Sequence, residues 1–282
     1  MHDQKEIQDI LLKYGEPESI TWLNDKILKI LADRSSKDLF MAYSISNVKF
    51  DGSEPVNFEG EKNDTVNYFR THYASLLQIA RIYLLSAVLE QDLDFYTPKV
   101  ATIIEVADTG ELETFLKYLV LLPNPEAYKN TAVEALRTNI ATVFDAIALN
   151  NPYPATYFDE QQWNQMYLKA AFMERDLGKI ESIDQRANED LARIISDYAH
   201  ERWAAKRKVD PLFWRPVATF LNETLLNDIQ RLFESDDVWE NRAAVLCCIH
   251  SGNHKALELL NNYPEAKEEV ETNNISWNTL KQ

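Results

Sequence analysis

The chain has 282 residues, of which 45% are hydrophobic and 26% are charged, and its formal net charge is −16 at pH 7. This balance is typical of a globular protein that is long enough to bury a large core. Because the negative charge repels nucleic-acid phosphates and anionic lipid headgroups, the composition predicts no nucleic-acid partner.

Three features of the sequence bear on its location. The two cysteines, Cys247 and Cys248, are neighbours and make poor disulfide partners, which fits a reducing compartment. The first ten residues lack a basic segment followed by an apolar one, so no secretory signal is predicted. The most apolar run, 79–89, contains Arg81 and is too short to span a bilayer, so it predicts a buried helix. We therefore expect a cytoplasmic protein with no direct membrane insertion.

Apolar residues recur at helical spacing along most of the chain, and only 6 Gly and 10 Pro are present. In the first third this spacing predicts helices at 3–14, 19–33, 64–90 and 92–107. Between the second and third of these, residues 35–62 lose the pattern and contain Gly52, Pro55 and Gly60. We expect a long irregular loop there, and loops of this length often act as lids.

Capping residues place the later helices. Asp108 with Glu111 is a variant of the capping box, and Asn124 with Pro125 fits the start of a helix that runs to Leu149. Asp159 and Asp184 cap the helices predicted at 159–175 and 184–207. A short helix is predicted to begin at Pro211, and further helices are predicted at 222–235, 238–251 and 254–262.

These elements show no alternation of strands and helices. The sequence therefore predicts an all-α fold, an antiparallel helical array that is either a HEAT-like α-solenoid or a compact helical bundle. No segment is rich enough in Gly, Ser or Pro to mark a boundary, so we expect a single all-helical domain over residues 1–282. A polar tail, 265–282, ends it.

Arg202 stands out because a helical wheel places it on the same side as Leu191 and Ile195. An arginine on an apolar face needs a carboxylate partner or a route to water. We expect Arg202 to be mostly buried and paired with a carboxylate. The candidate partners are Glu126, Asp145 and Asp184.

Polar and aromatic residues are mixed densely in the predicted helices 124–149, 159–175 and 184–207. One interpretation is a structural network that fixes the register of the helices. The other is a pocket with a polar floor and an aromatic rim, suited to a partly apolar ligand. The candidate ligand-binding residues are Arg137, Asn139, Tyr153, Trp163, Asn164, Tyr167, Arg186, His200, Arg202, Trp203 and Trp214.

His200 and Glu201 begin like the zinc motif HExxH, but Ala204 stands where the second histidine would be. They are weak candidates for an acid/base pair, since no nucleophile accompanies them at a fixed spacing.

Cys247, His250 and His254 have the spacing of metal ligands, but Gly252 interrupts their helix and no fourth ligand is evident. The sequence also lacks a glycine-rich phosphate loop. We expect neither a metal nor a cofactor.

A family resemblance is carried by segments between residues 121 and 216. They read LLPNPEAY (121–128), ALRTNIATVFDAIALNNPYP (135–154), WNQMYLKAAF (163–172), IDQRANEDLA (183–192), and DYAHERWAAKR followed by FWRP (197–216). In this combination the chain resembles the EboA family of metabolite traffic proteins. The family-like core is expected at 111–262, and the N-terminal region 1–110 resembles the family only in helical character.

The resemblance implies an accessory role in the processing or export of a small metabolite, with prenylated compounds among the candidates. It also implies partners encoded in the same operon. The family supplies no catalytic residues to carry over. The polar residues inside the matching segments are Arg137, Asn139, Asn164, Lys169, Asp184, Arg186, Asn188, His200, Glu201 and Arg202.

Three functions remain open on these grounds. The favoured one is a non-enzymatic protein that binds a small metabolite or a pathway partner in a groove formed by the helices 124–149, 159–175 and 184–207. The second is a scaffold that docks other proteins of the same operon. The third is an enzyme that uses His200 and Glu201 as acid and base.

Overall fold

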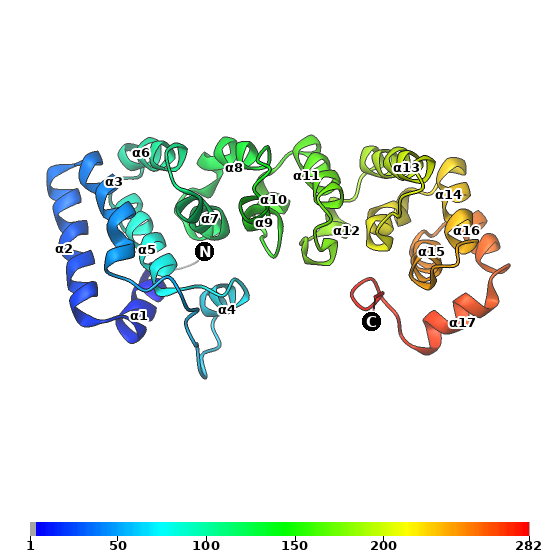
Figure 1. Cartoon of the computed structure of the whole chain (residues 1–282), viewed down its shortest axis with the longest axis horizontal. Coiled ribbons are helices and arrows are strands. Elements are labelled where there is room, and N and C mark those ends of the chain that lie inside the picture. The colour runs from blue at the N-terminus through cyan, green and yellow to red at the C-terminus, as the bar shows by residue number, and fades with distance from the viewer. Residues whose placement is uncertain (1–3, 282) are drawn as a thin grey trace. The chain divides into compact units, whose positions relative to one another are not determined.

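The computed structural model describes residues 4–281 and confirms the predicted all-α fold (Figure 1). Over this range the single extended pairing is an isolated antiparallel bridge between Pro55 and Ser75. The chain divides into two compact units, residues 1–153 and 154–282, called unit 1 and unit 2 below. None of the helices within 4–281 combines the length and the apolar character needed to cross a bilayer.

Unit 1 arranges its helices in two layers, with α6 and α8 on one side and α5, α7 and α9 on the other (Figure 1). Its α-helices are α1 (Gln4–Tyr14), α2 (Pro17–Asp33), α3 (Ser36–Ile45), α4 (Asp64–Thr71), α5 (Leu76–Gln91), α6 (Leu93–Glu105), α7 (Thr109–Tyr118), α8 (Lys129–Ala135) and α9 (Ala141–Ala148). Its 3-10 helices are η1 (Ser46–Val48), η2 (Leu119–Leu121) and η3 (Pro125–Tyr128).

Helix α5 forms the centre of unit 1. A capping box of Ser75 and Gln78 begins it, and every residue from 79 to 89 is buried, as the apolar run predicted. Its one charged residue in that run, Arg81, pairs with Glu111 of α7 at 3.4 Å. Glu111 also closes the predicted capping box with Asp108. A buried charge is tolerated here because it is paired and hydrogen-bonded.

The irregular segment of unit 1 is shorter than the predicted loop 35–62. Ser35 accepts a hydrogen bond from the Asp38 amide and starts α3, which the polar and aromatic composition of this stretch had concealed. The irregular part is confined to 49–63, and backbone hydrogen bonds tie it to the start of α5, for example from Leu77 to Asp51.

The helix predicted at 124–149 is wrong as a single element. Asn124 adopts a left-handed conformation without capping by its side chain, and η3, α8 and α9 follow. Between α8 and α9 the chain breaks at 136–140, where the Thr138 hydroxyl accepts a hydrogen bond from the Ile140 amide at 3.0 Å. Thr and Asn compete for backbone hydrogen bonds in this way, which explains a break at Thr138 and Asn139.

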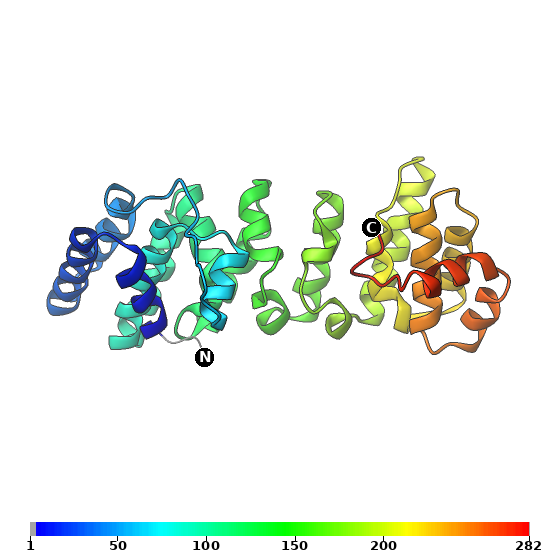
Figure 2. The same cartoon turned by 90° about the horizontal axis from the view of Figure 1, so that it is seen from below.

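Unit 2 begins at Pro154, the second residue of α10 (Tyr153–Tyr157). Within it, α17 crosses α15 in the view from below (Figure 2). Its α-helices are α11 (Glu160–Phe172), α12 (Ile183–Arg186), α13 (Glu189–Ala204), α14 (Glu223–Phe233), α15 (Val238–His250), α16 (His254–Leu260) and α17 (Pro264–Thr272). Its 3-10 helices are η4 (Leu177–Lys179) and η5 (Pro211–Phe220).

The polar tail predicted at 265–282 is ordered over its described part. It contains most of α17, and Val270, Trp277 and Leu280 are buried. Arg242 of α15 donates hydrogen bonds to the Glu269 carboxylate and the Leu280 carbonyl. A few apolar anchors in a polar sequence are therefore enough to hold this segment against the core.

The helix predicted at 184–207 is divided. Asp184 does not cap it but lies in α12, where it binds Arg215 through two hydrogen bonds of 2.8 and 2.6 Å. These hydrogen bonds lower the pKa of the Asp184 carboxyl. Asn188 is the N-cap of α13 and accepts from the Leu191 amide at 2.8 Å.

Candidate functional site

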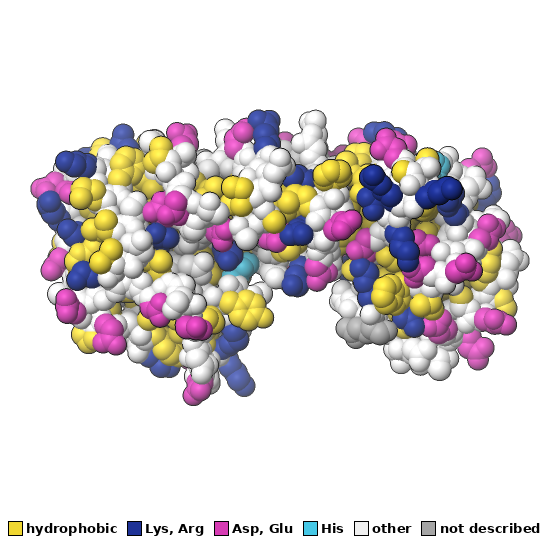
Figure 3. Space-filling model, viewed as in Figure 1, with side chains coloured by type: hydrophobic (Ala, Val, Ile, Leu, Met, Phe, Trp, Pro, Cys, Tyr) yellow, Lys and Arg dark blue, Asp and Glu magenta, His cyan; other side chains and the backbone are white. Residues whose placement is uncertain are grey.

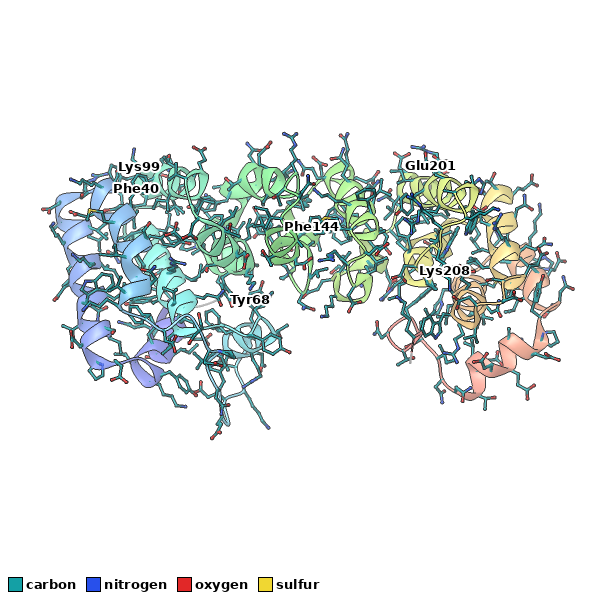
Figure 4. All side chains as sticks on the ribbon, viewed as in Figure 1. Phe40, Tyr68, Lys99, Phe144, Glu201 and Lys208 are labelled. Atoms are coloured by element: carbon teal, nitrogen blue, oxygen red, sulfur yellow. The ribbon has the colours of Figure 1, made fainter. Side chains whose placement is uncertain are left out.

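A groove of about 610 Å³ lies in unit 2 between α11 and the C-terminal part of α13. This volume is within the range of small-molecule sites. Figure 4 marks its region by Glu201 on α13 and by Lys208 in the segment that follows. The residues that line the groove are Gln165, Leu168, Lys169, Phe172, Tyr198, Glu201, Arg202, Ala205 and Arg207.

The two walls of the groove have the same spacing. Four lining residues from α11 follow the order i, i+3, i+4, i+7, and so do four from the α13 side, which places each set on one side of its helix. Asp159, the predicted cap, starts α11 and forms a capping box with Gln162. At the start of α13, the side-chain amides of Asn188 and of Asn164 in α11 donate hydrogen bonds to each other at 3.1 and 2.9 Å. This pair links α11 to the beginning of α13.

Phe172 gives the groove its apolar character. It is the last residue of α11 and is 70% exposed, whereas Trp163 and Tyr167 of the same helix are 1% and 0% exposed. Leu168 and Tyr198 extend the apolar lining on either side. A single exposed ring is common on protein surfaces, but an exposed ring beside other apolar side chains in a concave site indicates a ligand or partner surface.

The C-terminus of α13 folds back and brings two arginines to the groove. Lys206 adopts the left-handed conformation at φ 56°. Its amide donates to the Trp203 carbonyl at 2.9 Å, and the Arg207 amide donates to the Arg202 carbonyl at 2.8 Å. These two bonds define a Schellman motif, which reverses the chain after the helix. Arg207 is thereby returned to the same end of the groove as Arg202.

The groove is basic, although the chain as a whole is acidic. Lys169, Arg202 and Arg207 line it with a single carboxylate, Glu201. Partial burial lowers the pKa of the Lys169 ammonium from its usual value. Figure 3 shows Lys and Arg side chains gathered around the region of α13, with hydrophobic side chains beside them.

Arg202 has a different partner from those predicted. Its side chain is 22% exposed, and its Nε and Nη2 donate to the Lys208 carbonyl at 3.0 and 2.8 Å. The nearest carboxylate is Glu174, at 3.9 Å. Of the three predicted partners, Asp184 binds Arg215, and Glu126 and Asp145 belong to unit 1. The turn after α13 supplies a carbonyl that a wheel projection of the helix could not show.

The four deeply buried aromatic candidates lie in the cores of their units and do not line the groove. Tyr153 donates to the Pro125 carbonyl at 2.9 Å, and Tyr167 donates to the Leu212 carbonyl at 3.2 Å. Trp163 and Trp214 are 1% and 0% exposed, and within residues 4–281 neither indole N–H has an acceptor.

The polar candidates outside α13 have structural contacts. Arg137 and Asn139 are exposed in the break between α8 and α9, where Arg137 pairs with Glu134 at 2.7 Å. Arg186 covers the Trp163 ring at 5.0 Å and donates to the Ala155 carbonyl at 2.6 Å. It also donates to the carbonyls of Pro154, Phe158 and Asp159. Arg186 therefore secures the turn between α10 and α11.

His200 and Glu201 are directed to different neighbours. His200 shares a hydrogen bond of 2.6 Å between its Nε2 and the Asp228 carboxylate of α14, which also accepts from Ser196 at 2.6 Å. Glu201 lines the groove, and His200 does not. Consecutive helical residues point about 100° apart, so the pair does not converge on one site.

Trp203 lies on the His200 side of α13. It stacks on Trp214 with a centroid distance of 5.7 Å, and the Arg231 guanidinium covers it at 4.3 Å. Of the candidate ligand-binding residues, Arg202 alone lines the groove.

The cysteine–histidine spacing near the C-terminus does not make a cluster. Cys247 is buried, and its thiol donates to the Trp214 carbonyl at 3.5 Å. Burial raises the pKa of this thiol. His254 is exposed and faces Glu258. No group of three or more His, Cys, Asp or Glu side chains within residues 4–281 is placed to hold a metal ion.

The site predicted from the sequence did not include the apolar residues of the groove. Leu168, Phe172, Tyr198 and Ala205 were assigned to helices but to no site. A signal for them exists, since Phe172 falls outside the stripe of Trp163 and Tyr167. The sequence signal for this groove is the shared spacing i, i+3, i+4, i+7 from Gln165 to Phe172 and from Tyr198 to Ala205.

A family model described as metabolite traffic protein EboA matches residues 4–218. The match includes every residue that lines the groove. It covers the N-terminal region that the resemblance had placed outside the family-like core, and it ends before the expected limit at 262. No curated protein matches the chain, and neither does any solved structure.

Proposed function

The chain belongs to the EboA family of metabolite traffic proteins, and from this premise we propose that it binds a small, partly apolar metabolite in the groove between α11 and α13. The groove combines apolar walls with a few charged groups, as sites for such ligands do. The proposed role is binding without catalysis, in the processing or export of that metabolite.

Phe172 carries the proposal. Its ring is 70% exposed at the end of an otherwise well-packed helix and lines a cavity of about 610 Å³. A bound apolar group would remove this ring from water, and full burial of a Phe side chain contributes about 1.5–3 kcal/mol. Two of the three helical regions expected to form the groove, 159–175 and 184–207, supply its walls in unit 2.

The test uses the full chain and N-phenyl-1-naphthylamine, a neutral aromatic probe whose fluorescence rises in apolar sites. We expect the wild type to bind the probe and Phe172→Ala to weaken binding about tenfold, since a loss of about 1.4 kcal/mol corresponds to a factor of ten. Leu28→Ala is the matched control, because Leu28 is 66% exposed on α2 in unit 1. Its affinity for the probe should equal that of the wild type.

The proposal fails if the wild type does not bind the probe, or if Phe172→Ala and Leu28→Ala bind it equally well. Circular dichroism of each variant checks that the fold is retained. Phe172 is suited to this test because its exposed ring contributes little to the core, whereas replacement of the buried Trp163 by Ala would cost about 3–5 kcal/mol of stability.

The location and the partners are part of the same proposal. Cys247 and Cys248 are both free and buried, which supports a reducing, cytoplasmic compartment. The proposed partners are the metabolite itself and proteins of the same operon, which would deliver or receive it.

A further inference from the structure

We infer that the ligand of the α11–α13 groove is an amphipathic anion, whose acidic head is held by Arg202 and Arg207 and whose apolar body covers Phe172. The inference rests on the proposed function and adds the charge class of the ligand. Carboxylate, sulfonate and phosphate heads share the chemistry that two guanidinium groups recognise.

The charge of the groove is the first observation. The whole chain has 45 acidic and 29 basic residues, but the groove is lined by three basic residues, Lys169, Arg202 and Arg207, and by one acidic residue, Glu201. In a protein of net charge −16, a concave site of the opposite sign attracts anions that the rest of the surface repels.

The placing of Arg202 and Arg207 is the second observation. They occupy the positions of the Schellman motif that usually hold an apolar contact between the last turn of the helix and the residue after the reversal. Here both positions hold arginines, so the turn brings two positive charges to the lining of the groove.

The bonding of the two guanidinium groups is the third observation. Within residues 4–281, Arg207 forms no ion pair, and its guanidinium makes no hydrogen bond. Arg202 is fixed through Nε and Nη2 by the Lys208 carbonyl, and its Nη2 lies 3.9 Å from the exposed Glu174 carboxylate. Its Nη1 has no protein acceptor in that range. A positive side chain near the C-terminus of a helix is stabilised by the partial negative charge of the last carbonyls. This accounts for the position of Arg202 but not for that of Arg207, whose side chain binds none of those carbonyls. A donor that is already held in place loses little entropy on binding an anion.

The test compares two probes that share one aromatic body. 8-Anilinonaphthalene-1-sulfonate carries a sulfonate, and N-phenyl-1-naphthylamine lacks it. We expect the full chain to bind the sulfonate probe more tightly, and Arg207→Gln to weaken that binding about three- to tenfold, the range for one charge-assisted contact at a partly exposed site. Binding of the neutral probe should be unchanged in Arg207→Gln.

Lys206→Gln is the matched control. It removes the same charge from the same turn, but Lys206 does not line the groove, so its affinity for the sulfonate probe should stay within about twofold of the wild type. Raising NaCl from ~50 mM to ~500 mM should weaken binding of the sulfonate probe and not of the neutral one.

The inference is overturned if the two probes bind equally well, or if Lys206→Gln weakens sulfonate binding as much as Arg207→Gln does. In either case a loss of neutral-probe binding in Phe172→Ala would leave the proposed function standing. If neither probe binds the wild type, the proposed function fails together with the inference.

Discussion

His72 is a buried titratable group in unit 1 and lies far in sequence from the groove residues. Its ring is 4.6 Å from that of Tyr68 and 5.7 Å from that of Tyr118, and its Nε2 lies 3.0 Å from the Asn150 carbonyl. A carbonyl can only accept, so Nε2 carries the proton of the neutral imidazole. Burial, together with the charge of Lys117, lowers the pKa of His72 from 6.5 to about 4.

This pKa predicts a pH-dependent loss of stability. Above pH 6.5 neither the folded nor the unfolded chain holds the proton, so the full stability is present. As the pH falls from 6.5 to about 4, the unfolded chain takes up the proton while folded His72 stays neutral, and the free energy of unfolding drops. The contribution of this group across the window is about 3 kcal/mol.

His72→Gln tests this expectation, because its amide can still donate to the Asn150 carbonyl but cannot titrate. Urea unfolding at a series of pH values should show the variant losing about 3 kcal/mol less stability than the wild type between pH 6.5 and 4. Parallel stability curves for the two proteins would contradict the assignment of a neutral, buried His72.

At the scale of elements, Asn188 joins α11 to α13. Its side-chain oxygen caps α13 through the Leu191 amide at 2.8 Å, and its Nδ2 donates to the Asn164 side chain at 2.9 Å. The same nitrogen donates to the Arg186 carbonyl at 3.1 Å. One amide therefore caps a helix and sets the register of two neighbours that form the groove.

Asn188→Ala should lower the free energy of unfolding by about 2–3 kcal/mol, because it removes the cap and leaves the buried Asn164 amide without this partner. Asn188→Asp should lose about half as much, since aspartate keeps the cap but cannot donate to Asn164. Asp190→Ala, an exposed change in the first turn of α13, serves as the control. Equal losses in Asn188→Ala and Asn188→Asp by chemical unfolding would refute the role of the amide pair.

The sequence predicted the elements where the determining contacts are local. The capping box predicted at Asp108 and the cap predicted at Asp159 depend on residues three positions apart, and both are confirmed. The buried helix at 79–89 followed from composition alone. The break at Thr138 and the cap at Asn188 were not predicted. Apolar residues continue at helical spacing through both positions, and this signal outweighed the weaker tendency of Thr and Asn side chains to bond the backbone and interrupt a helix.

At the scale of the whole molecule, the sequence could not separate buried aromatics from exposed ones. Trp163, Tyr167 and Phe172 all lie on α11, but only the last is exposed. Contacts distant in sequence decide this, such as the packing of Tyr167 on Phe213 at 5.6 Å. A periodic pattern therefore identifies the helix and its apolar faces without showing which face remains open.

The family match extends over parts of both units. The match begins at residue 4 in unit 1 and ends at residue 218, within η5 of unit 2, so it includes α11, α13 and the groove between them. Helices α14–α17 follow the matched range. The predicted groove drew on helices of both units, whereas the groove described above is built within unit 2 alone.

The most direct test of the central claim is native mass spectrometry of the full chain, purified gently from its own organism. We expect the wild type and Leu28→Ala to carry a small molecule that Phe172→Ala has lost, and the mass of that molecule would identify its chemical class. A wild-type chain that is bare, or that is found only in complexes with other proteins, would contradict metabolite binding and favour a scaffold.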